Sequence, residues 1–243
     1  MNIKLTIQYD GTDYHGWQIQ KNGKTIQQKI TDAIFAATGE VVNVTGCGRT
    51  DAGVHGDNYI CNFHTQTTLP PDRLVYILNN HLPEDIICKK SEAVSDDFCA
   101  IRSAVKKTYV YTIYNAEFGD VFYNRYAWHY KFPLDIDKMR AEAKAFLGEH
   151  DFAAFAASGL SVKSTVRTIY AVDIQKHGDV ITIAVTGNGF LYNMVRIITG
   201  TLVQAGGGML CNVEEIIESR DRTRAGITAP ACGLCLKEVC YDE

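Results

Sequence analysis

The sequence predicts an α+β fold made of two similar subdomains, residues 1–104 and residues 105–243. Stretches in which apolar and polar residues alternate indicate strands, and apolar residues spaced three and four apart indicate helices. Both kinds of stretch occur in each half of the chain, and the composition changes little near residue 100. Each subdomain is therefore expected to be an α/β sandwich, an antiparallel or mixed sheet with helices on one face.

In the first half, the alternation of Ile3, Leu5 and Ile7 with polar residues is typical of a half-buried strand. A helix is expected to begin at the capping box of Thr25 and Gln28 and to end at Gly39. A second, short helix is expected to begin at Pro71 and to stop before Pro83. Further strands are predicted at residues 41–45, which are rich in β-branched side chains, 59–63 and 86–94.

In the second half, one strand is predicted to begin at residue 106, and a weaker pattern predicts another at 125–130. Three more strands are predicted, at residues 168–175, 180–186 and 232–241. The tripeptide His177-Gly178-Asp179 is expected to be the hairpin turn that joins two of these strands. Amphipathic spacing and glycine stops predict helices at residues 135–147, 190–204 and 213–219.

The charge of the chain gives little support to a nucleic-acid partner. There are 24 lysines and arginines against 28 acidic residues, a net charge of −4. Whole-chain charge is a weak guide, however, because nucleic acids bind to local basic grooves. Basic residues gather in three places, and each is a candidate RNA contact, although a solvated face is the simpler interpretation: Lys89-Lys90, Lys106-Lys107, and Arg220, Arg222 and Arg224.

Neither a membrane segment nor a cofactor motif is expected. The first residues do not resemble a signal peptide, and no apolar run approaches the roughly 18 residues that a membrane span needs. We therefore expect a cytoplasmic protein with free thiols at Cys47, Cys61, Cys88, Cys99, Cys211, Cys232, Cys235 and Cys240. The pair Cys232 and Cys235 lacks a second pair at zinc-site spacing, and phosphate-binding and dinucleotide-binding motifs are missing. No metal and no cofactor are predicted.

The stretch from Gly46 to Gly56 holds four glycines in eleven residues and places Asp51 in a loop after a predicted strand. Taken alone, an aspartate in such a loop is typical of a tight turn with a solvated carboxylate. The alternative is a functional loop on a rigid scaffold. The longer string resembles, residue for residue, the signature of the bacterial tRNA pseudouridine synthase A family: Gly48-Arg49-Thr50-Asp51-Ala52-Gly53-Val54-His55-Gly56. A match over this length is far more specific than a short pattern.

Two further stretches resemble the same family, residues 97–111 and residues 189–196. Cys99 and Ile101 stand where relatives often have histidine and arginine, so an RNA contact is expected to differ there. Helical spacing places Arg196 opposite the apolar arc of its predicted helix, which by itself indicates a solvated side chain.

The resemblance implies a pseudouridine synthase core and assigns roles to particular residues. Asp51 is implied to be the catalytic nucleophile, and Arg196 is implied to pair with it and keep it ionised. Tyr109 is implied to stack on the target base and is also a catalytic candidate that could move a proton late in the cycle, although a core tyrosine is the simpler interpretation of its strand position. Arg49 is implied to enter the RNA stack.

The remaining candidate site residues are weaker. His55 is a candidate either for RNA contact or for a hydrogen bond that orders the loop. Lys106 and Lys107 are candidates for substrate binding. The residues do not decide whether Asp51 attacks C6 or C1′ of the uridine or whether a proton is abstracted instead.

The function implied by the resemblance is isomerisation of a flipped-out uridine to pseudouridine in the anticodon arm of tRNA, at positions 38 to 40. The enzyme is implied to be a homodimer that needs no metal and no cofactor. The rival hypothesis is a non-catalytic module on the same fold that binds or folds RNA. Such a module would use Tyr109 and the basic clusters and would not need Asp51.

Overall fold

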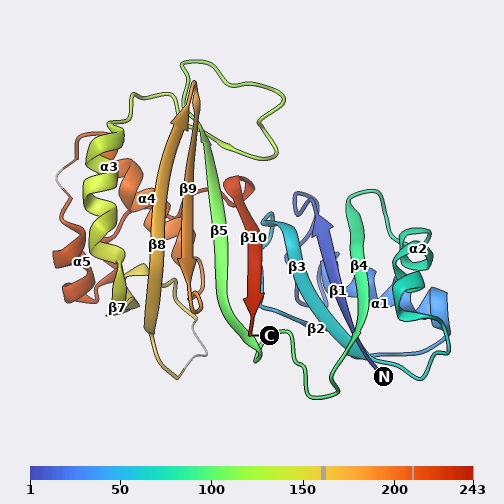
Figure 1. Ribbon diagram of the computed structural model, residues 1–243. Helices are drawn as coiled ribbons and strands as arrows, with labels where there is room; N and C mark the ends of the chain where they lie inside the picture. Colours follow the sequence, from blue (N-terminus) through green and yellow to red (C-terminus); the bar gives the residue numbers. More distant parts are fainter. Residues whose placement is uncertain (160–162, 210, 243) are drawn as a thin grey trace. The chain divides into compact units, whose positions relative to one another are not determined.

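The computed structural model describes residues 1–159, 163–209 and 211–242 (Figure 1). It forms two compact units, one of Met1–Val105 together with Cys235–Glu243, and one of Lys106–Leu234. Strands and helices are mixed along both units, which confirms the α+β class. The last strand of the chain thus belongs to the unit that contains the first strand.

The sheet of the first unit runs in the order β4-β1-β3-β10, with the short β2 paired to β3. Its strands are β1 (Asn2–Tyr9), β2 (Thr45–Gly46), β3 (His55–His64), β4 (Ile86–Val94) and β10 (Leu234–Tyr241). Strand β1 is antiparallel to β3 and to β4, whereas β10 is parallel to β3. The apolar residues of β1 are buried, as their alternation predicts.

The helical segments of the first unit are α1 (Ile26–Thr38), the 3-10 turn η1 (Pro71–Arg73) and α2 (Leu74–Asn79). The hydroxyl of Thr25 accepts a hydrogen bond from the amide of Gln28 at 3.4 Å, so Thr25 caps the helix as predicted, whereas the Gln28 side chain donates to Asp32 at 2.6 Å. Gly39 ends α1 with a φ of 76°, a left-handed conformation that glycine adopts without a steric penalty.

The prediction of a strand at residues 41–45 is wrong for most of its length. Only Thr45 and Gly46 pair with β3, and Val41 is 88% exposed. The backbone carbonyl of Val44 accepts a hydrogen bond from the Gln27 side chain at 2.8 Å. The Val44 carbonyl is thus bonded to a side chain on α1, and β-branched residues alone do not make a strand.

The sheet of the second unit runs in the order β5-β9-β8-β7, and β6 pairs in parallel with β5. Its strands are β5 (Ala104–Tyr114), β6 (Trp128–His129), β7 (Gly148–Asp151), β8 (Val166–His177) and β9 (Val180–Gly187). The hairpin of β8 and β9 turns at Gly178, whose φ is 58°. Three helices, α3 (Ile136–Ala143), α4 (Met194–Gly206) and α5 (Val213–Ser219), complete the main elements.

Short 3-10 turns follow several of these elements, namely η2 (Lys144–Phe146), η3 (Ala153–Phe155), η4 (Arg222–Arg224) and η5 (Ala231–Gly233). The helix predicted to begin at residue 190 begins later, at Met194. Asn193 has a φ of 61°, which is incompatible with the interior of a right-handed helix and delays the start. Within the described ranges, no helix is both long enough and apolar enough to cross a membrane.

Candidate active site

The signature loop, residues 47–54, connects β2 to β3 in the first unit. Asp51 lies in its middle and is half-buried, whereas the side chain of Arg49 is exposed. The carbonyl of Asp51 accepts a hydrogen bond from the amide of Val54 at 3.1 Å, which closes a turn. The loop therefore presents an aspartate from a defined turn and leaves an arginine two residues earlier in solvent.

Aromatic residues support the first part of this loop. The Tyr59 hydroxyl donates to the carbonyl of Gly48, and the Trp17 ring stacks on Tyr59 with 4.3 Å between ring centroids. A Cβ at Gly46 would lie 2.0 Å from the Tyr59 hydroxyl oxygen, so only glycine fits beside this ring. Gly46, two residues before the signature, thus allows close packing of backbone on aromatic side chains.

His55 is the first residue of β3 and is 5% exposed. Its Nδ1 lies 3.0 Å from the amide nitrogen of Gly11, which donates to it, and 3.2 Å from the Asp10 carboxylate. These contacts tie the end of the signature loop to the chain after β1. Of the two roles considered for His55, they favour ordering of the loop.

Tyr109 lies in the middle of β5 in the second unit, opposite Val185 of β9, and is 9% exposed. Its ring meets Phe190 edge to face, with 5.2 Å between centroids. Lys107, two residues earlier, points to the same face of the strand as Tyr109 because side chains alternate, whereas the exposed Lys106 points to the opposite face. The lysine pair therefore does not act as one patch.

Arg196, near the start of α4, is held by the chain around it. Its Nε donates to the carbonyl of Ala229 at 2.7 Å, and its Nη1 donates to the Asn193 side chain at 2.8 Å. Its own carbonyl accepts from the amide of Ala229 at 3.2 Å. Helical spacing indicates a solvated Arg196, but the structure shows its side chain hydrogen-bonded, because the segment around Ala229 packs against this face of the helix.

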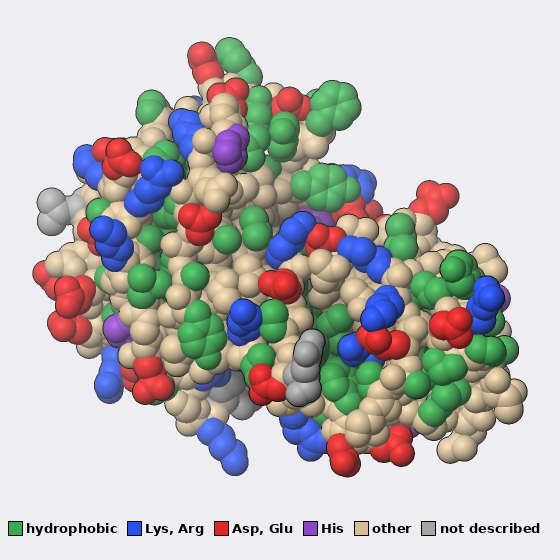
Figure 2. Space-filling view, in the orientation of Figure 1, with side chains coloured by type: hydrophobic (Ala, Val, Ile, Leu, Met, Phe, Trp, Pro, Cys, Tyr) green, Lys and Arg blue, Asp and Glu red, His purple; other side chains and the backbone are tan. Residues whose placement is uncertain are grey.

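The C-terminal arginine cluster makes contacts within its own unit. Arg220 pairs with Asp151 at 3.1 Å, Arg224 pairs with Glu215 at 3.2 Å, and Arg222 donates to backbone carbonyls of the following turn. Lys89 and Lys90 of the first unit are similarly paired, with Asp57 at 3.2 Å and with Glu92 at 2.7 Å. Figure 2 shows cationic and anionic side chains intermixed over the face in view.

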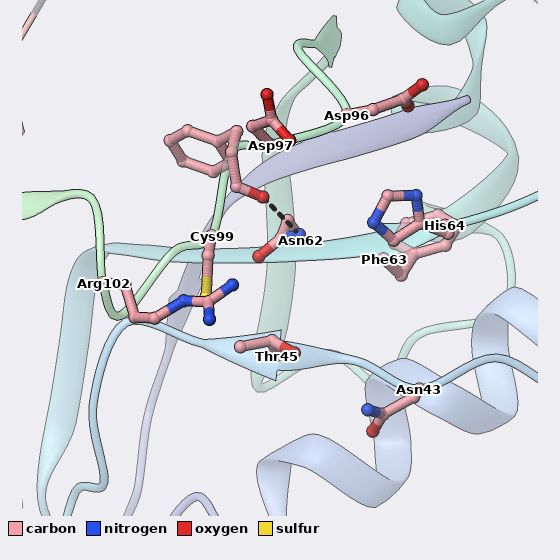
Figure 3. A pocket seen from close by; sticks show the side chains of 10 residues that line it. Asn43, Thr45, Asn62, Phe63, His64, Asp96, Asp97, Cys99 and Arg102 are labelled. Atoms are coloured by element: carbon pink, nitrogen blue, oxygen red, sulfur yellow. Dashed lines mark hydrogen bonds between the residues drawn. The ribbon is translucent and has the colours of Figure 1, made fainter.

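A polar cavity of about 310 Å³ opens in the first unit, at the far end of β3 from the signature loop (Figure 3). It is lined by Asn43, Thr45, Asn62, Phe63, His64, Asp96, Asp97, Phe98, Cys99 and Arg102. The Cys99 sulfur lies beside the Arg102 guanidinium, and the Asn62 side chain donates to the Phe98 carbonyl at 3.3 Å. Sequence reasoning missed this cavity because it is assembled from three separate segments with no shared motif.

The thiol of Cys99 is electrostatically unusual. Burial alone would raise its pKa, but hydrogen bonds from the amides of Arg102 and Ile101 and from the Arg102 guanidinium lower the pKa overall. Of the residues whose placement is described, no three histidines, cysteines or acids are grouped so that they could hold a metal ion.

The fold and the signature loop are those of a pseudouridine synthase. A family model described as tRNA pseudouridine synthase matches residues 5–101 and 142–242. The chain belongs to the tRNA pseudouridine synthase A family, an isomerase family.

Proteins named tRNA pseudouridine synthase A match nearly the whole chain. The protein of Thermoanaerobacter sp. (strain X514) is 47% identical over 99% of both chains. That of Acetivibrio thermocellus is 48% identical over 99% of both, and that of Ruminiclostridium cellulolyticum is 49% identical over 98% of this chain and 99% of its own. A solved Cbf5-Nop10-Gar1 complex aligns with 96% of this chain and 57% of its own at 12% identity and a TM-score of 0.41, a likeness too low to bear on function.

Proposed function

We propose that this protein converts uridine to pseudouridine in the anticodon arm of tRNA, at positions 38 to 40, with Asp51 as the nucleophile. The observation that carries the proposal is the full-length similarity to tRNA pseudouridine synthase A proteins, which includes the signature loop. The turn that holds Asp51 half-buried adds support, because a nucleophile must keep a fixed direction.

The reaction breaks the bond between N1 and C1′, turns the uracil, and joins C5 to C1′. The proton on C5 leaves and N1 takes up a proton, so the product is an isomer and no redox partner or co-reactant is required. An ionised carboxylate on Asp51 can attack C1′ or C6, or a proton can be abstracted, and the proposal leaves these routes open. Arg196 keeps the carboxylate ionised by pairing with it.

The uridine must leave the helical stack before the reaction, which costs a few kcal/mol. The exposed side chain of Arg49 enters the space that the base vacates. Tyr109 stacks on the flipped base, an interaction worth roughly 1–3 kcal/mol. Lys107, on the same strand face as Tyr109, meets the RNA backbone, while His55 orders the loop.

The proposal extends to a cytoplasmic homodimer in which both subunits contact one tRNA. A chain of net charge −4 needs a local basic groove to hold a polyanion, and two subunits can build a larger groove than one. The size of the free protein and of its tRNA complex in solution tests this part independently of the chemistry.

The decisive experiment replaces Asp51 by asparagine and measures single-turnover pseudouridine formation and tRNA binding on the same preparation. Asparagine keeps the shape and removes the charge, so turnover is expected to fall on the order of 10⁶-fold. Binding is expected to change little, because phosphates and stacked bases provide most of the affinity. Asp72→Asn, an exposed aspartate on the 3-10 turn η1, is the matched control and is expected to behave like wild type.

Two results would contradict the proposal. Near-normal turnover in Asp51→Asn would remove Asp51 from the chemistry. Wild-type protein that binds tRNA but forms no pseudouridine would instead indicate the non-catalytic RNA-binding module.

A further inference from the structure

A buried pair of hydroxyl groups lies directly behind the proposed nucleophile. The side-chain oxygens of Tyr9 and Thr50 are 2.9 Å apart, and the two residues are 2% and 7% exposed. Thr50 immediately precedes Asp51, whereas Tyr9 ends β1, 41 positions earlier in the chain. The bond therefore connects β1, which lies between β4 and β3 in the sheet, to the residue that leads into Asp51.

The backbone of Thr50 is held by residues that follow Tyr9 closely in the chain. Its carbonyl accepts a hydrogen bond from the amide of Trp17 at 3.1 Å. Gly16, with a φ of 82°, packs so closely on Thr50 that a Cβ would lie 2.3 Å from the Thr50 carbonyl oxygen. Both the side chain and the main chain of Thr50 are thus held by residues 9–17, which we call the clamp segment.

The clamp segment also reaches the other side of Asp51. The amide of Gly53 donates to the carbonyl of Tyr14 at 3.2 Å, and the amide of Gly11 donates to His55 at 3.0 Å. Asp51 is therefore flanked before and after by residues that the clamp segment holds. These contacts fix the backbone from which the Asp51 side chain extends.

We propose that Tyr9 is a positioning residue, whose hydroxyl acts through Thr50 to fix the direction in which Asp51 presents its carboxylate. This inference rests on the proposed role of Asp51 as nucleophile. A displacement of about 1 Å at a reacting group can cost on the order of 10²-fold in rate, although binding is unaffected. Loss of the Tyr9 hydroxyl leaves the Thr50 hydroxyl buried without its partner, so the loop relaxes.

The competing explanation is that the Tyr9 hydroxyl only stabilises the fold. Tyr241 offers a matched control, because its hydroxyl donates to the carbonyl of Ala100 at 2.9 Å in the same unit and lies near Cys47, at the start of the signature loop, and does not act through Thr50. Tyr9→Phe and Tyr241→Phe each delete one hydroxyl, and with it the bond to Thr50 or to the Ala100 carbonyl. A purely structural role predicts the same small effect on turnover for both variants.

The experiment compares wild type, Tyr9→Phe, Thr50→Val, Thr50→Ser and Tyr241→Phe. Single-turnover pseudouridine formation at saturating enzyme is expected to fall about 10- to 100-fold in Tyr9→Phe and Thr50→Val, with unchanged tRNA affinity. Thr50→Ser, which keeps the hydroxyl, is expected to retain most of the rate. The double variant Tyr9→Phe/Thr50→Val is expected to be no slower than the slower single variant, because both remove the same bond.

Hydrogen exchange gives a second readout that does not depend on activity. The amides of Trp17 and Val54 are bonded to the carbonyls of Thr50 and Asp51. They are expected to exchange faster in Tyr9→Phe and to be unchanged in Tyr241→Phe.

The inference is overturned if Tyr9→Phe turns over at the wild-type rate, or if Tyr241→Phe slows the reaction equally. It is also overturned if exchange at Trp17 and Val54 does not change in Tyr9→Phe. If wild type forms no pseudouridine while exchange still responds to Tyr9→Phe, the proposed function fails and the coupling of Tyr9 to the loop is supported.

Discussion

Replacement of Gly200 by alanine is expected to destabilise this protein, although the same change stabilises most helices. Gly200 lies in the interior of α4, where alanine is normally favoured over glycine by about 1 kcal/mol. A Cβ at this position would lie 1.9 Å from the backbone carbonyl oxygen of Ile227. Because the obstacle is backbone, it cannot rotate away, and the segment that contains Ile227 must retreat from the helix.

The loss of folding free energy comes from the hydrogen bonds that this displacement breaks. Gly226 donates to the Thr201 hydroxyl at 2.8 Å in a buried bond, and Ala229 donates to the Arg196 carbonyl at 3.2 Å. Overpacking costs about 1–3 kcal/mol, and a buried donor left without its partner costs about 1–3 kcal/mol more. After the gain in helix propensity, we expect a net loss of about 3 kcal/mol, which lowers the Tm of a chain of this size by roughly 6–12 °C.

Thermal unfolding of Gly200→Ala, followed by circular dichroism, measures this loss. Gly206→Ala, at the last residue of the same helix, is the control, because its Cβ would meet Met139 Cγ at 2.7 Å and the Asp135 carbonyl oxygen at 3.3 Å, and a methionine side chain can adjust more readily than backbone. The control is expected to lose clearly less stability. A Gly200→Ala variant as stable as wild type would show that the close approach of the helix to residues 226–229 does not constrain the fold.

Two further predictions concern titrating groups. Hydrogen bonds from Lys237 and Lys89 hold the pKa of Asp57 below its usual range. The ionised carboxylate therefore stabilises the folded state at pH values above its unfolded pKa of about 4. This stabilisation is lost as the pH falls through the lower pKa of the folded state. Asp57→Asn is therefore expected to be less stable than wild type in urea at pH 7, with a gap that closes toward pH 3; a constant gap would refute the ion pairing. Because the pKa of the Cys99 thiol is lowered, iodoacetamide is expected to alkylate Cys99 faster than the other half-buried cysteines near neutral pH, and Arg102→Met is expected to slow this reaction several-fold. Mass spectrometry of digested protein over time tests this, and equal rates at all half-buried cysteines would contradict it.

Interactions between residues close together in the chain determine several of the helices and strands of this protein. The cap at Thr25, the stop at Gly39 and the strand at residues 2–9 follow from interactions within a few residues or from a simple alternation, and the structure confirms them. The family signature, Gly48 to Gly56, was recognisable because its nine residues are contiguous in the chain. The family assignment needed no tertiary information for the same reason.

Contacts between distant segments decided the rest. The pattern of residues 41–44 predicts a strand, but the Gln27 side chain donates a hydrogen bond to the carbonyl of Val44. Arg196 looks solvated on a helical wheel, but Ala229, 33 residues later, accepts its hydrogen bond. The last strand, β10, pairs in parallel with β3, a partner that no local pattern specifies. Helix spacing and strand alternation report only which side of an element is apolar; the partner that covers each side is set by packing of the whole chain.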